Sequence, residues 1–533
     1  MIKEIIKKNI KDAVGEEAEI FIPENEKFGH YSTNIALRLA KEKSKKPMEI
    51  AEEIINDLRL TTDNFFEKIE IASPGFINFW ISEKTLQNEL KEILKNKNNY
   101  GKYPQAKSYK LKAINLEFIS ANPTGPLTIG NGRGGFFGDV LANILKFTGN
   151  KITKEYYIND AKNSTQIREL GKTGLGLGET YLTPELKKTI STLKKKTARL
   201  KKKSPDNIAG EAGYLLASEI NKQNKKFVEK VLKIKFDKWF SEESLYKSGV
   251  VKKILSDLKK KKLVYEKEDA LWFKAKQFGD SEDRVLIRKT GEPTYIVPDL
   301  AYHIDKFKKR KFEKAIDVWG ADHHGYIPRL KAGLKSLGIS EDRLKIIVTQ
   351  LVRLVKNGQE YKMSKRKGDY VTMEDLIKEV GLDVARFFFL MSAPDTHMNF
   401  DLDLAKEKSM KNPVYYVQYA AVRCQSILQK ANDKRRTTNI KYELLNTNED
   451  VNLMRTMARF PEVMEEAAGK YNPQVLVRYS IDLARQFHNF YEKERIIGER
   501  SDLMSARLEL IKATKTIFEI LFKLLGISYP KKM

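Results

Sequence analysis

Predicted strands and helices alternate along the chain from Leu111 to about Asp403, and no other feature constrains the fold as strongly. KLKAINLEFIS reads as a buried strand, GGFFGDVLANILKFTGN as a helix that stops at Gly149, and KEYYIND as the next strand. The same order continues through YIVPDLAYHIDKF, AIDVWGADHH, GYIPRLKAGLKSLG and KIIVTQLVRLV. Strands that are joined by helices usually run parallel, so the pattern predicts an α/β fold with a mostly parallel sheet.

Other regions flank and interrupt this alternation. The length of 533 residues predicts about three domains. Residues 1–105 read as a small α/β unit that ends in the polar linker NKNNYGKYPQAKSYK, and residues 406–533 read as helical to the end. The central domain is therefore predicted to span 106–405, with an insertion at about 165–255.

Composition restricts the partners and the compartment. Lys and Arg number 98 against 71 Asp and Glu, a net charge of +27, which favours polyanionic partners with nucleic acid first. The single cysteine, Cys424, excludes an internal disulfide and a zinc site built on several cysteines, and it suits a reducing cytoplasm. No apolar run approaches 18 residues, so no membrane span is expected. The N-terminal segment has the mixed charges of an amphipathic helix and does not read as a signal peptide.

A lysine-rich run lies inside the predicted insertion. KKTISTLKKKTARLKKK, residues 187–203, holds nine basic side chains and no acidic one. A thin apolar stripe through Ile190, Leu193 and Leu200 predicts a helix. Two interpretations stay open: a solvated surface helix, or a surface that contacts an RNA backbone by displacing its counterions.

The first candidate site is the strand, turn and helix at residues 114–147. Glycines 125, 130, 132, 134 and 135 would let a ligand approach the backbone, and the start of the helix presents free N–H groups that suit a phosphate. The spacing is neither the dinucleotide fingerprint nor a Walker A loop. By itself, the segment is equally consistent with a structural tight turn.

The second candidate site is the short basic segment YKMSKRKGD, residues 361–369. Lys362, Lys365, Arg366 and Lys367 lie there beside a glycine, between two regular segments. Lysines on such a loop can neutralise the charge that develops on a transferring phosphoryl or adenylyl group. A solvated surface loop is the simpler interpretation when the segment is considered alone.

Taken together, the two sites resemble the ATP-binding signatures of class I aminoacyl-tRNA synthetases. The segments EFISANPTGPLTIGNGRGGFFGDVL, EYYIND, FDKWFSEESLY, YIVPDLAYH, WGADHHGYIPRLK, YKMSKRKGDYVTMEDLI and NPVYYVQYAAVRC resemble arginyl-tRNA synthetases and occur in the order of that family. HYSTNIALRLAK and ASPGFINFW resemble its additional N-terminal domain. The resemblance covers nearly the whole chain, and the lysine-rich run at 187–203 is the part it does not account for.

The resemblance implies a fold and an activity. The fold would be a Rossmann-like catalytic domain at 106–405, an N-terminal tRNA-binding domain and a helical anticodon-binding bundle. The activity would convert L-arginine and ATP into arginyl-adenylate and pyrophosphate, and then transfer arginine to the 3′-terminal adenosine of tRNA(Arg). Magnesium would accompany ATP, held mainly by the phosphates, and no zinc would be required. The family further implies a cytoplasmic monomer that needs bound tRNA for the activation step.

One signature departs from the family pattern. Where the family has His-x-Gly-His, this chain has Thr128, Ile129, Gly130 and Asn131. A hydroxyl and an amide can still donate hydrogen bonds to ATP phosphates, but neither can become a cationic ring. We therefore expect a working site with an altered pH dependence. The alternative is a degenerate synthetase that binds tRNA without activating arginine, against which the intact lysine segment argues.

The resemblance also assigns roles to individual residues. Lys362, Lys365, Thr128 and Asn131 are the expected catalytic residues. The expected ATP-binding residues are Pro123, Thr124, Gly125, Pro126, Leu127, Thr128, Ile129, Gly130, Asn131, Gly132, Met363 and Ser364. The expected arginine-binding residues are Glu117, Ser120, Asn122, Tyr295, Asp299, Asp322 and His323. The expected tRNA contacts are Asn78, Tyr415, Tyr419 and Arg423.

Simpler interpretations stand beside several of these roles. Carboxylates suit a guanidinium because it pairs with them through two hydrogen bonds, but each acid could be a capping or surface residue. Tyr295, Tyr415 and Tyr419 could pack in a core. The neighbouring His323 and His324 do not predict a metal site, because no third ligand is evident. A class I synthetase for another amino acid would need a different pocket.

Overall fold

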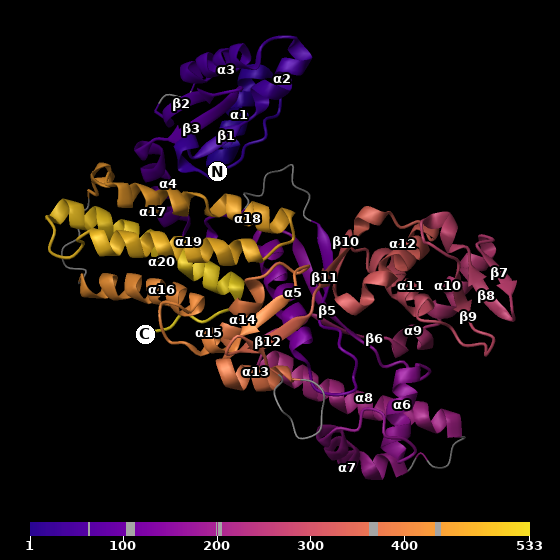
Figure 1. The fold of residues 1–533 in the computed structure, drawn as a ribbon. Helices are drawn as coiled ribbons and strands as arrows, with labels where there is room; N and C mark the ends of the chain where they lie inside the picture. Colours follow the sequence, from indigo (N-terminus) through magenta and orange to yellow (C-terminus); the bar gives the residue numbers. More distant parts are fainter. Residues whose placement is uncertain (62–63, 103–111, 199, 201–204, 362–370, 432–438) are drawn as a thin grey trace.

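A parallel sheet forms the centre of the molecule (Figure 1). The computed structural model describes the chain except for residues 62–63, 103–111, 199, 201–204, 362–370 and 432–438. Within that part the strands lie in the order β11-β10-β4-β5-β6, and every neighbouring pair is parallel. The strands are β4 (Ala113–Glu117), β5 (Lys151–Ile158), β6 (Lys238–Ser241), β10 (Lys314–Gly320) and β11 (Leu344–Thr349). The predicted α/β fold with a parallel sheet is confirmed.

The two faces of this sheet have different partners. Ile114 and Leu116 of β4 point to the face that packs on α5 (Ile129–Phe147). The opposite face, which includes Tyr157 and Ala315, packs on α11 (Ile296–Ile304) and α12 (Ile327–Ser336). Side chains alternate between the faces of a strand, so Glu117 points toward α11. A short π-helix, Asp305–Lys309, follows α11, and its Lys306 side chain contacts Glu117.

Helix α5 begins earlier than the sequence predicts. Residues 129–133 were expected in a glycine-rich turn, but they form the first turns of the helix. Each glycine in a helix costs about 1 kcal/mol relative to alanine. Buried Arg133 offsets part of this cost, because its guanidinium donates to the carbonyls of Gln350, Ala393 and Thr396 at 2.7, 2.7 and 2.8 Å.

The N-terminal unit is a small sheet covered by helices. Its strands pair antiparallel in the order β1-β3-β2. The elements are α1 (Ile2–Val14), β1 (Tyr31–Thr33), α2 (Ile35–Lys43), α3 (Pro47–Thr61), β2 (Phe66–Ala72), β3 (Phe76–Ile81) and α4 (Glu83–Asn96). The unit docks on the C-terminal helices, where Glu462 accepts hydrogen bonds from the Lys3 backbone N–H at 2.9 Å and from the Tyr31 hydroxyl at 3.0 Å.

The inserted region is a group of helices followed by a return to the main sheet. Helices α6 (Thr165–Leu175) and α8 (Pro205–Lys230) cross closely, because Gly171 and Gly213 have no side chain at the crossing. A side chain at either position would collide with the backbone of the other helix. Helix α7 (Pro184–Ala198) packs against α8. Strand β6 lies within the predicted insertion at 165–255 but pairs with β5, so the helical insertion is shorter than predicted. The next elements are α9 (Glu243–Lys247), α10 (Val250–Lys260), β7 (Val264–Lys267), β8 (Ala270–Phe273) and β9 (Arg284–Ile287).

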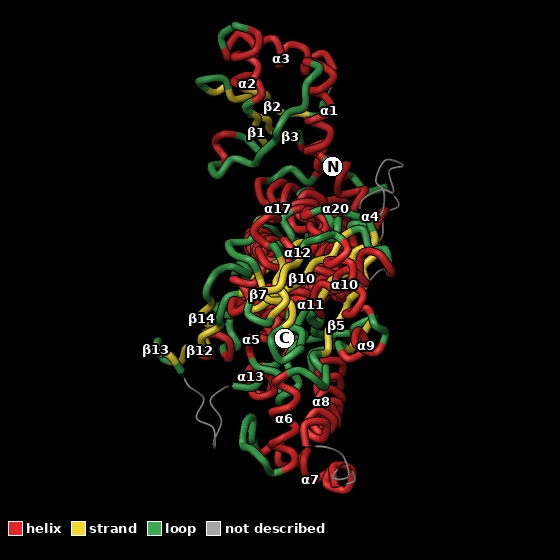
Figure 2. Tube along the Cα trace, turned by 90° about the vertical axis from the view of Figure 1, so that its right-hand side faces the viewer, coloured by secondary structure: helices red, strands yellow, loops and turns green. Residues whose placement is uncertain are grey.

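The C-terminal part is helical, as predicted. It is preceded by a small sheet of β12 (Val352–Lys356), β13 (Gln359–Glu360) and β14 (Met398–Asp401), with α13 (Met373–Val380), α14 (Leu382–Leu390) and α15 (Leu402–Lys406). The bundle contains α16 (Pro413–Lys430), α17 (Asn448–Ala458), α18 (Phe460–Gly469), α19 (Gln474–Lys493) and α20 (Ser501–Leu525). The N-terminal unit lies at one end of the molecule and α7 at the other (Figures 1 and 2). None of the described helices combines the length and apolar character that a membrane crossing requires.

Candidate active site

The predicted site residues of the central domain gather at the carboxyl ends of the parallel strands. The glycine-rich segment follows β4, and Asp322 and His323 follow β10; Glu242, which was not predicted, follows β6. Open parallel sheets bind ligands at this edge, because the loops that leave neighbouring strands meet there.

The start of α5 is organised by a capping box. Thr128 is the N-cap residue, and its hydroxyl accepts a hydrogen bond from the Asn131 backbone N–H at 3.4 Å. The Asn131 side-chain oxygen accepts from the Thr128 backbone N–H and hydroxyl, both at 3.0 Å. The two residues in place of the signature histidines therefore hold each other. The Asn131 amino group has no hydrogen-bond acceptor in the described part of the chain, and Gly130 beside it is exposed.

The second signature lies outside the described residues, including Lys362, Met363, Ser364 and Lys365. The chain that follows it is anchored on the first signature. The Met373 backbone N–H donates to the Leu127 carbonyl at 2.8 Å, and Thr372 forms a β-bridge with Thr128. Gly132 lets the Met373 side chain pack directly against the helix, because a side chain at position 132 would force the Met373 sulfur to move. The described segment that follows the second signature thus meets the first signature at the start of α5.

Three carboxylates form a row across the sheet on its α11 side. Glu155, Glu117 and Asp317 occupy matching positions on β5, β4 and β10, and all are buried. We call them the acid row. Lys306 Nζ lies 2.8 Å from Glu117 Oε2 and 2.9 Å from Asp317 Oδ1, and its side chain is fully buried. Arg310 pairs with Glu155. The acid row is therefore neutralised within the protein.

The two acids that share Lys306 titrate differently. Burial raises the pKa of Glu117, because desolvation outweighs the attraction of Lys306. Burial also opposes ionisation of Asp317, but Lys306 and His303 outweigh it and lower the pKa of Asp317 to about 2. His303 Nε2 lies 2.8 Å from Asp317 Oδ2, a second contact that Glu117 does not have. Glu117 instead accepts a hydrogen bond from the Ser120 hydroxyl at 3.0 Å.

A second acidic group has no cation beside it. Asp299 lies in the first turn of α11, and Glu242 follows β6 with 7% of its surface exposed. Neither carboxylate forms an ion pair with a lysine, arginine or histidine among the described residues. Burial raises the pKa of Asp299. Burial, together with the negative charges of Asp299 and Asp160, raises the pKa of Glu242 to about 8. We call Asp299 and Glu242 the acid pair.

Tyrosines surround the acid pair. The pKa of Tyr246 is raised to about 12, first by burial and then by the charge of Glu242. Burial also raises the pKa of Tyr157 and Tyr326, and the charges of Asp299 and Glu242 add to both shifts. Aromatic rings and unneutralised carboxylates together favour a cationic ligand. Glu242 was not among the predicted site residues, because β6, the strand that it follows, lies inside the predicted insertion.

The remaining predicted arginine-binding residues differ in exposure. Ser120 is turned inward: it donates to Glu117 and accepts from the Tyr157 backbone N–H at 3.0 Å. It follows Ile119 in a left-handed conformation, with φ of 38° and 69°, which is strained for both residues. Asn122 is exposed. Tyr295 starts α11 one turn before Asp299 and is 60% exposed, so it is not a core tyrosine.

Asp322 and His323 lie on a 3₁₀ turn, Ala321–Tyr326, directly after β10. Their side chains are 79% and 60% exposed and lie 3.4 Å apart. They reach the edge of the site from outside the buried acid pair. Within the described ranges, no three His, Cys, Asp or Glu residues are arranged to hold a metal ion.

The predicted tRNA contacts divide into one buried and three accessible residues. Asn78 is buried in the N-terminal sheet, where its side-chain oxygen accepts from the Ser32 hydroxyl at 2.7 Å, so its side chain does not reach the surface. Tyr415, Tyr419 and Arg423 form a half-exposed ladder along one face of α16. The two rings stack at 6.2 Å, and the Arg423 guanidinium lies 5.1 Å from the Tyr419 ring centre.

Three family models match the chain. The model described as arginyl tRNA synthetase N terminal domain matches residues 1–81. The model described as tRNA synthetases class I (R), catalytic domain, matches residues 187–439, and the DALR anticodon binding domain matches residues 417–533. The catalytic match begins at Lys187, so it includes the lysine-rich run that the sequence resemblance did not account for.

Full-length relatives agree with these matches. The arginine–tRNA ligase of Bacillus subtilis is 40% identical over 100% of this chain and 99% of its own length. That of Caldanaerobacter subterraneus subsp. tengcongensis is 39% identical over 100% of this chain and 98% of its own. The solved structure of Thermus thermophilus arginyl-tRNA synthetase matches with a TM-score of 0.78, 21% identity and full coverage of both chains, which shows a shared fold.

Proposed function

The chain belongs to the arginyl-tRNA synthetases, and from this premise we propose that the carboxyl edge of its central sheet binds arginine and ATP side by side. The protein is an arginine–tRNA ligase, and its reaction is the aminoacylation of tRNA with arginine in two steps. The assignment of individual residues to these steps is our proposal.

The acid pair binds the guanidinium of arginine. The observation that supports this most is that half-buried Asp299 and buried Glu242 form no ion pair with any described residue, while the acid row next to them is neutralised by lysine and arginine side chains. Unpaired buried carboxylates are costly, so a fold keeps them where a ligand supplies the charge. A guanidinium can bridge two carboxylates with its several N–H donors. Tyr295 closes the pocket from the solvent side.

Glu117 acts mainly through its neighbours. Its two oxygens already accept hydrogen bonds from Lys306 and Ser120. It therefore fixes the strained segment after β4, which leads to the exposed Asn122. We propose that Asn122 takes the α-ammonium group of arginine, with Asp322 and His323 at the outer edge of the site.

ATP lies over the start of α5. The helix N-terminus and the free Asn131 amino group offer donors to phosphate oxygens, and residues 123–132 line the approach. Lys362 and Lys365 neutralise the α-phosphate and the departing pyrophosphate as the arginine carboxylate attacks. The oxygen-rich phosphates hold Mg²⁺, which suits a site without a protein cage of ligands.

tRNA(Arg) contacts the C-terminal bundle through the ladder on α16. Tyr415 and Tyr419 offer half-exposed rings for unpaired bases, and Arg423 adds a positive charge. We further propose that tRNA must be bound before arginine is activated, and that the protein works as a monomer in the cytoplasm.

The deciding experiment is ATP–pyrophosphate exchange with arginine, with and without tRNA, beside charging of that tRNA. Exchange and charging only in the presence of tRNA support the proposal, including function through Thr128 and Asn131. Tight tRNA binding without exchange or charging would instead indicate a non-catalytic tRNA-binding protein. Charging with another amino acid would refute the assignment of the acid pair.

A further inference from the structure

Helix α7 has five exposed lysines, of which Lys196 lies at the flank and the other four form two pairs on one face. Lys187, Lys188, Lys194 and Lys195 are exposed and recur at a seven-residue interval, so they lie on one side of the helix. Leu186 and Leu193 lie on the opposite side and pack against α8. None of the four lysines forms an ion pair with a carboxylate in the part of the chain that the structure describes. The helix is therefore fixed by its apolar side and presents unneutralised charge to solvent.

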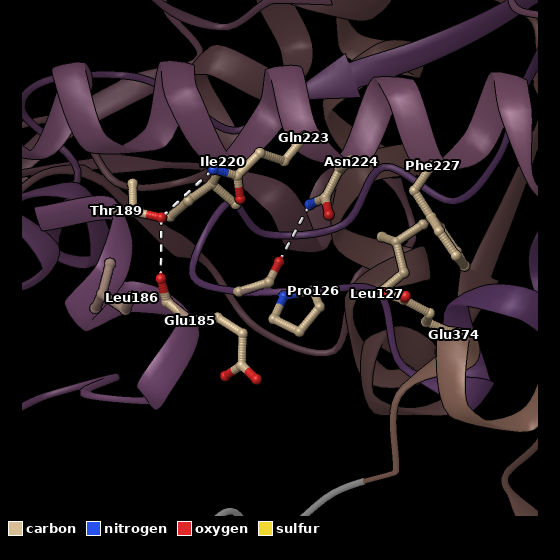
Figure 3. A pocket seen from close by; sticks show the side chains of 11 residues that line it. Pro126, Leu127, Glu185, Leu186, Thr189, Ile220, Gln223, Asn224, Phe227 and Glu374 are labelled. Carbon is tan, nitrogen blue, oxygen red and sulfur yellow. Dashed lines mark hydrogen bonds between the residues drawn. The ribbon is translucent and has the colours of Figure 1, made fainter. Parts of the chain in front are cut away.

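Helix α7 is next to the ATP-binding turn. A cavity of about 160 Å³ separates them, lined by Leu186 and Thr189 of α7, Asn224 and Phe227 of α8, and Pro126 of the turn (Figure 3). The Asn224 amide donates to the Gly125 carbonyl at 3.1 Å, which ties the insertion to the turn. Helix α7 thus faces the ATP-binding turn with its apolar side and turns its lysines outward, whereas the bundle α16–α20 is elsewhere on the molecule (Figure 1).

We propose that the four-lysine face of α7 binds the phosphate backbone of the tRNA acceptor stem. This inference rests on the proposed function, because only the acceptor end of a tRNA must reach the arginine and ATP site. The two lysine pairs are about 10 Å apart along the helix axis at 1.5 Å per residue, enough to contact separate phosphates. Lysines give a charge contact without base readout, so the face holds the stem in place and leaves tRNA identity to other surfaces.

The chain contains a matched control for this proposal. Helix α10 carries Lys252, Lys253, Lys259 and Lys260, four exposed lysines with the same spacing. The test compares the fourfold Lys→Gln variant on α7 with the fourfold Lys→Gln variant on α10, both in the full chain. We measure tRNA(Arg) binding over a range of salt concentrations, and the KM and kcat of charging.

For the α7 variant we expect the slope of log affinity against log salt to fall by about 3 to 4, since each lost lysine–phosphate contact lowers it by about one. KM for tRNA should rise tenfold or more at about 0.1 M salt, with kcat at saturating tRNA unchanged. The α10 variant should behave as wild type. A fourfold Lys→Arg variant on α7 keeps the charge and should show the wild-type salt slope and the wild-type KM for tRNA, which separates charge loss from misfolding.

Binding to isolated RNA arms locates the contact. The α7 variant should lose affinity for a hairpin of the acceptor stem and keep it for the anticodon stem-loop. Equal weakening by the α7 and α10 variants, loss confined to the anticodon arm, or loss of binding to anionic phospholipid vesicles with tRNA binding intact would each overturn the proposal. If wild type charges tRNA and the α7 variant binds it normally, the inference fails alone. If wild type binds but never charges, the proposed function fails instead.

Discussion

The acid row crosses the sheet on its α11 side, the acid pair lies near it, and the two groups differ in whether a described cation neutralises them. Glu117, Asp317 and Glu155 are matched by Lys306 and Arg310 inside the protein. Asp299 and Glu242 have no such cation among the described residues. The difference teaches that burial of a carboxylate does not by itself mark a binding residue. The informative property is whether the protein already supplies the counter-charge, because an acid that is already matched contributes mainly to the structure.

Removing the cation of the acid row should have the largest effect. Lys306→Met leaves Glu117 and Asp317 buried without the ammonium that they share, and breaking such an ion pair costs about 3–5 kcal/mol of unfolding free energy. Urea denaturation measures this loss. Lys309→Met is the control, since Lys309 belongs to the same π-helix but is largely exposed. Equal loss in both variants would show that the acid row does not depend on the buried ammonium.

Removing one acid of the pair should affect arginine and spare the fold. Asp299→Asn should lower kcat/KM for arginine by roughly a hundredfold to a thousandfold, the effect of about 3–4 kcal/mol for a buried charge-pair contact. The unfolding free energy of the protein without arginine should not fall, because no residue in the described part of the chain forms an ion pair with Asp299. Steady-state kinetics and thermal unfolding test both expectations.

The exposed Asp322 provides the comparison for Asp299. Asp322→Asn should change kcat/KM for arginine only slightly, since its side chain is largely solvated. A fall in kcat/KM as large as that of Asp299→Asn would indicate that the guanidinium binds nearer the surface, at the 3₁₀ turn after β10. KM for ATP should be unaltered in both variants.

Glu242 should make arginine binding depend on pH. Its pKa is raised to about 8 in the protein, first by burial and then by the charge of Asp299, so it is mostly protonated at pH 7. A cationic ligand favours the ionised form, and kcat/KM for arginine should therefore rise about tenfold between pH 7 and 9. Glu242→Gln should flatten this rise. An unchanged profile in the variant would assign the titration to another group.

The same shift has a consequence for stability with the opposite sign. The folded protein holds the Glu242 proton more tightly than the unfolded chain, whose glutamates titrate near 4.5. Stability in the absence of arginine should then fall as pH rises from about 4.5 to 8, because the unfolded chain releases this proton earlier. Glu242→Gln should reduce that fall, as measured by urea denaturation at several pH values.

The sequence predicted the sheet because each of its strands is apolar, short and separated from the next by helix-forming segments. It did not predict that α5 begins at Ile129, since glycines 130, 132, 134 and 135 disfavour a helix locally and the anchors of Arg133 come from residues more than 200 positions away. For the same reason β6 was placed inside the insertion: a four-residue strand is recognisable only by its pairing with β5.

In the candidate site, too, the sequence did not predict contacts between residues that are far apart along the chain. The edge of the sheet could be predicted from the order of segments, and the family resemblance proposed Asp299 as an arginine-binding residue. Glu117 looked like a free acid, because its partner Lys306 is 189 residues away. Glu242 was missed, because only the fold brings it to the same place as Asp299. The burial of Asn78 and the exposure of Tyr295 likewise depend on tertiary packing, which a local pattern does not report.

Asn131 combines both situations in one side chain: one of its polar groups has a partner within the protein and the other is available to a ligand. Its side-chain oxygen is engaged in the capping box, while its amino group is free to reach ATP. Asn131→Asp keeps an oxygen for the cap and removes the donor, whereas Asn131→Ala removes both. Both variants should raise KM for ATP about tenfold, the effect of one hydrogen bond to a charged group at about 1.5 kcal/mol. Only Asn131→Ala should also lower thermal stability, by about 1 kcal/mol for the lost cap. A wild-type KM for ATP in Asn131→Asp would mean that this position contributes to the shape of the helix start alone, and that the backbone N–H groups of α5 suffice for the phosphates.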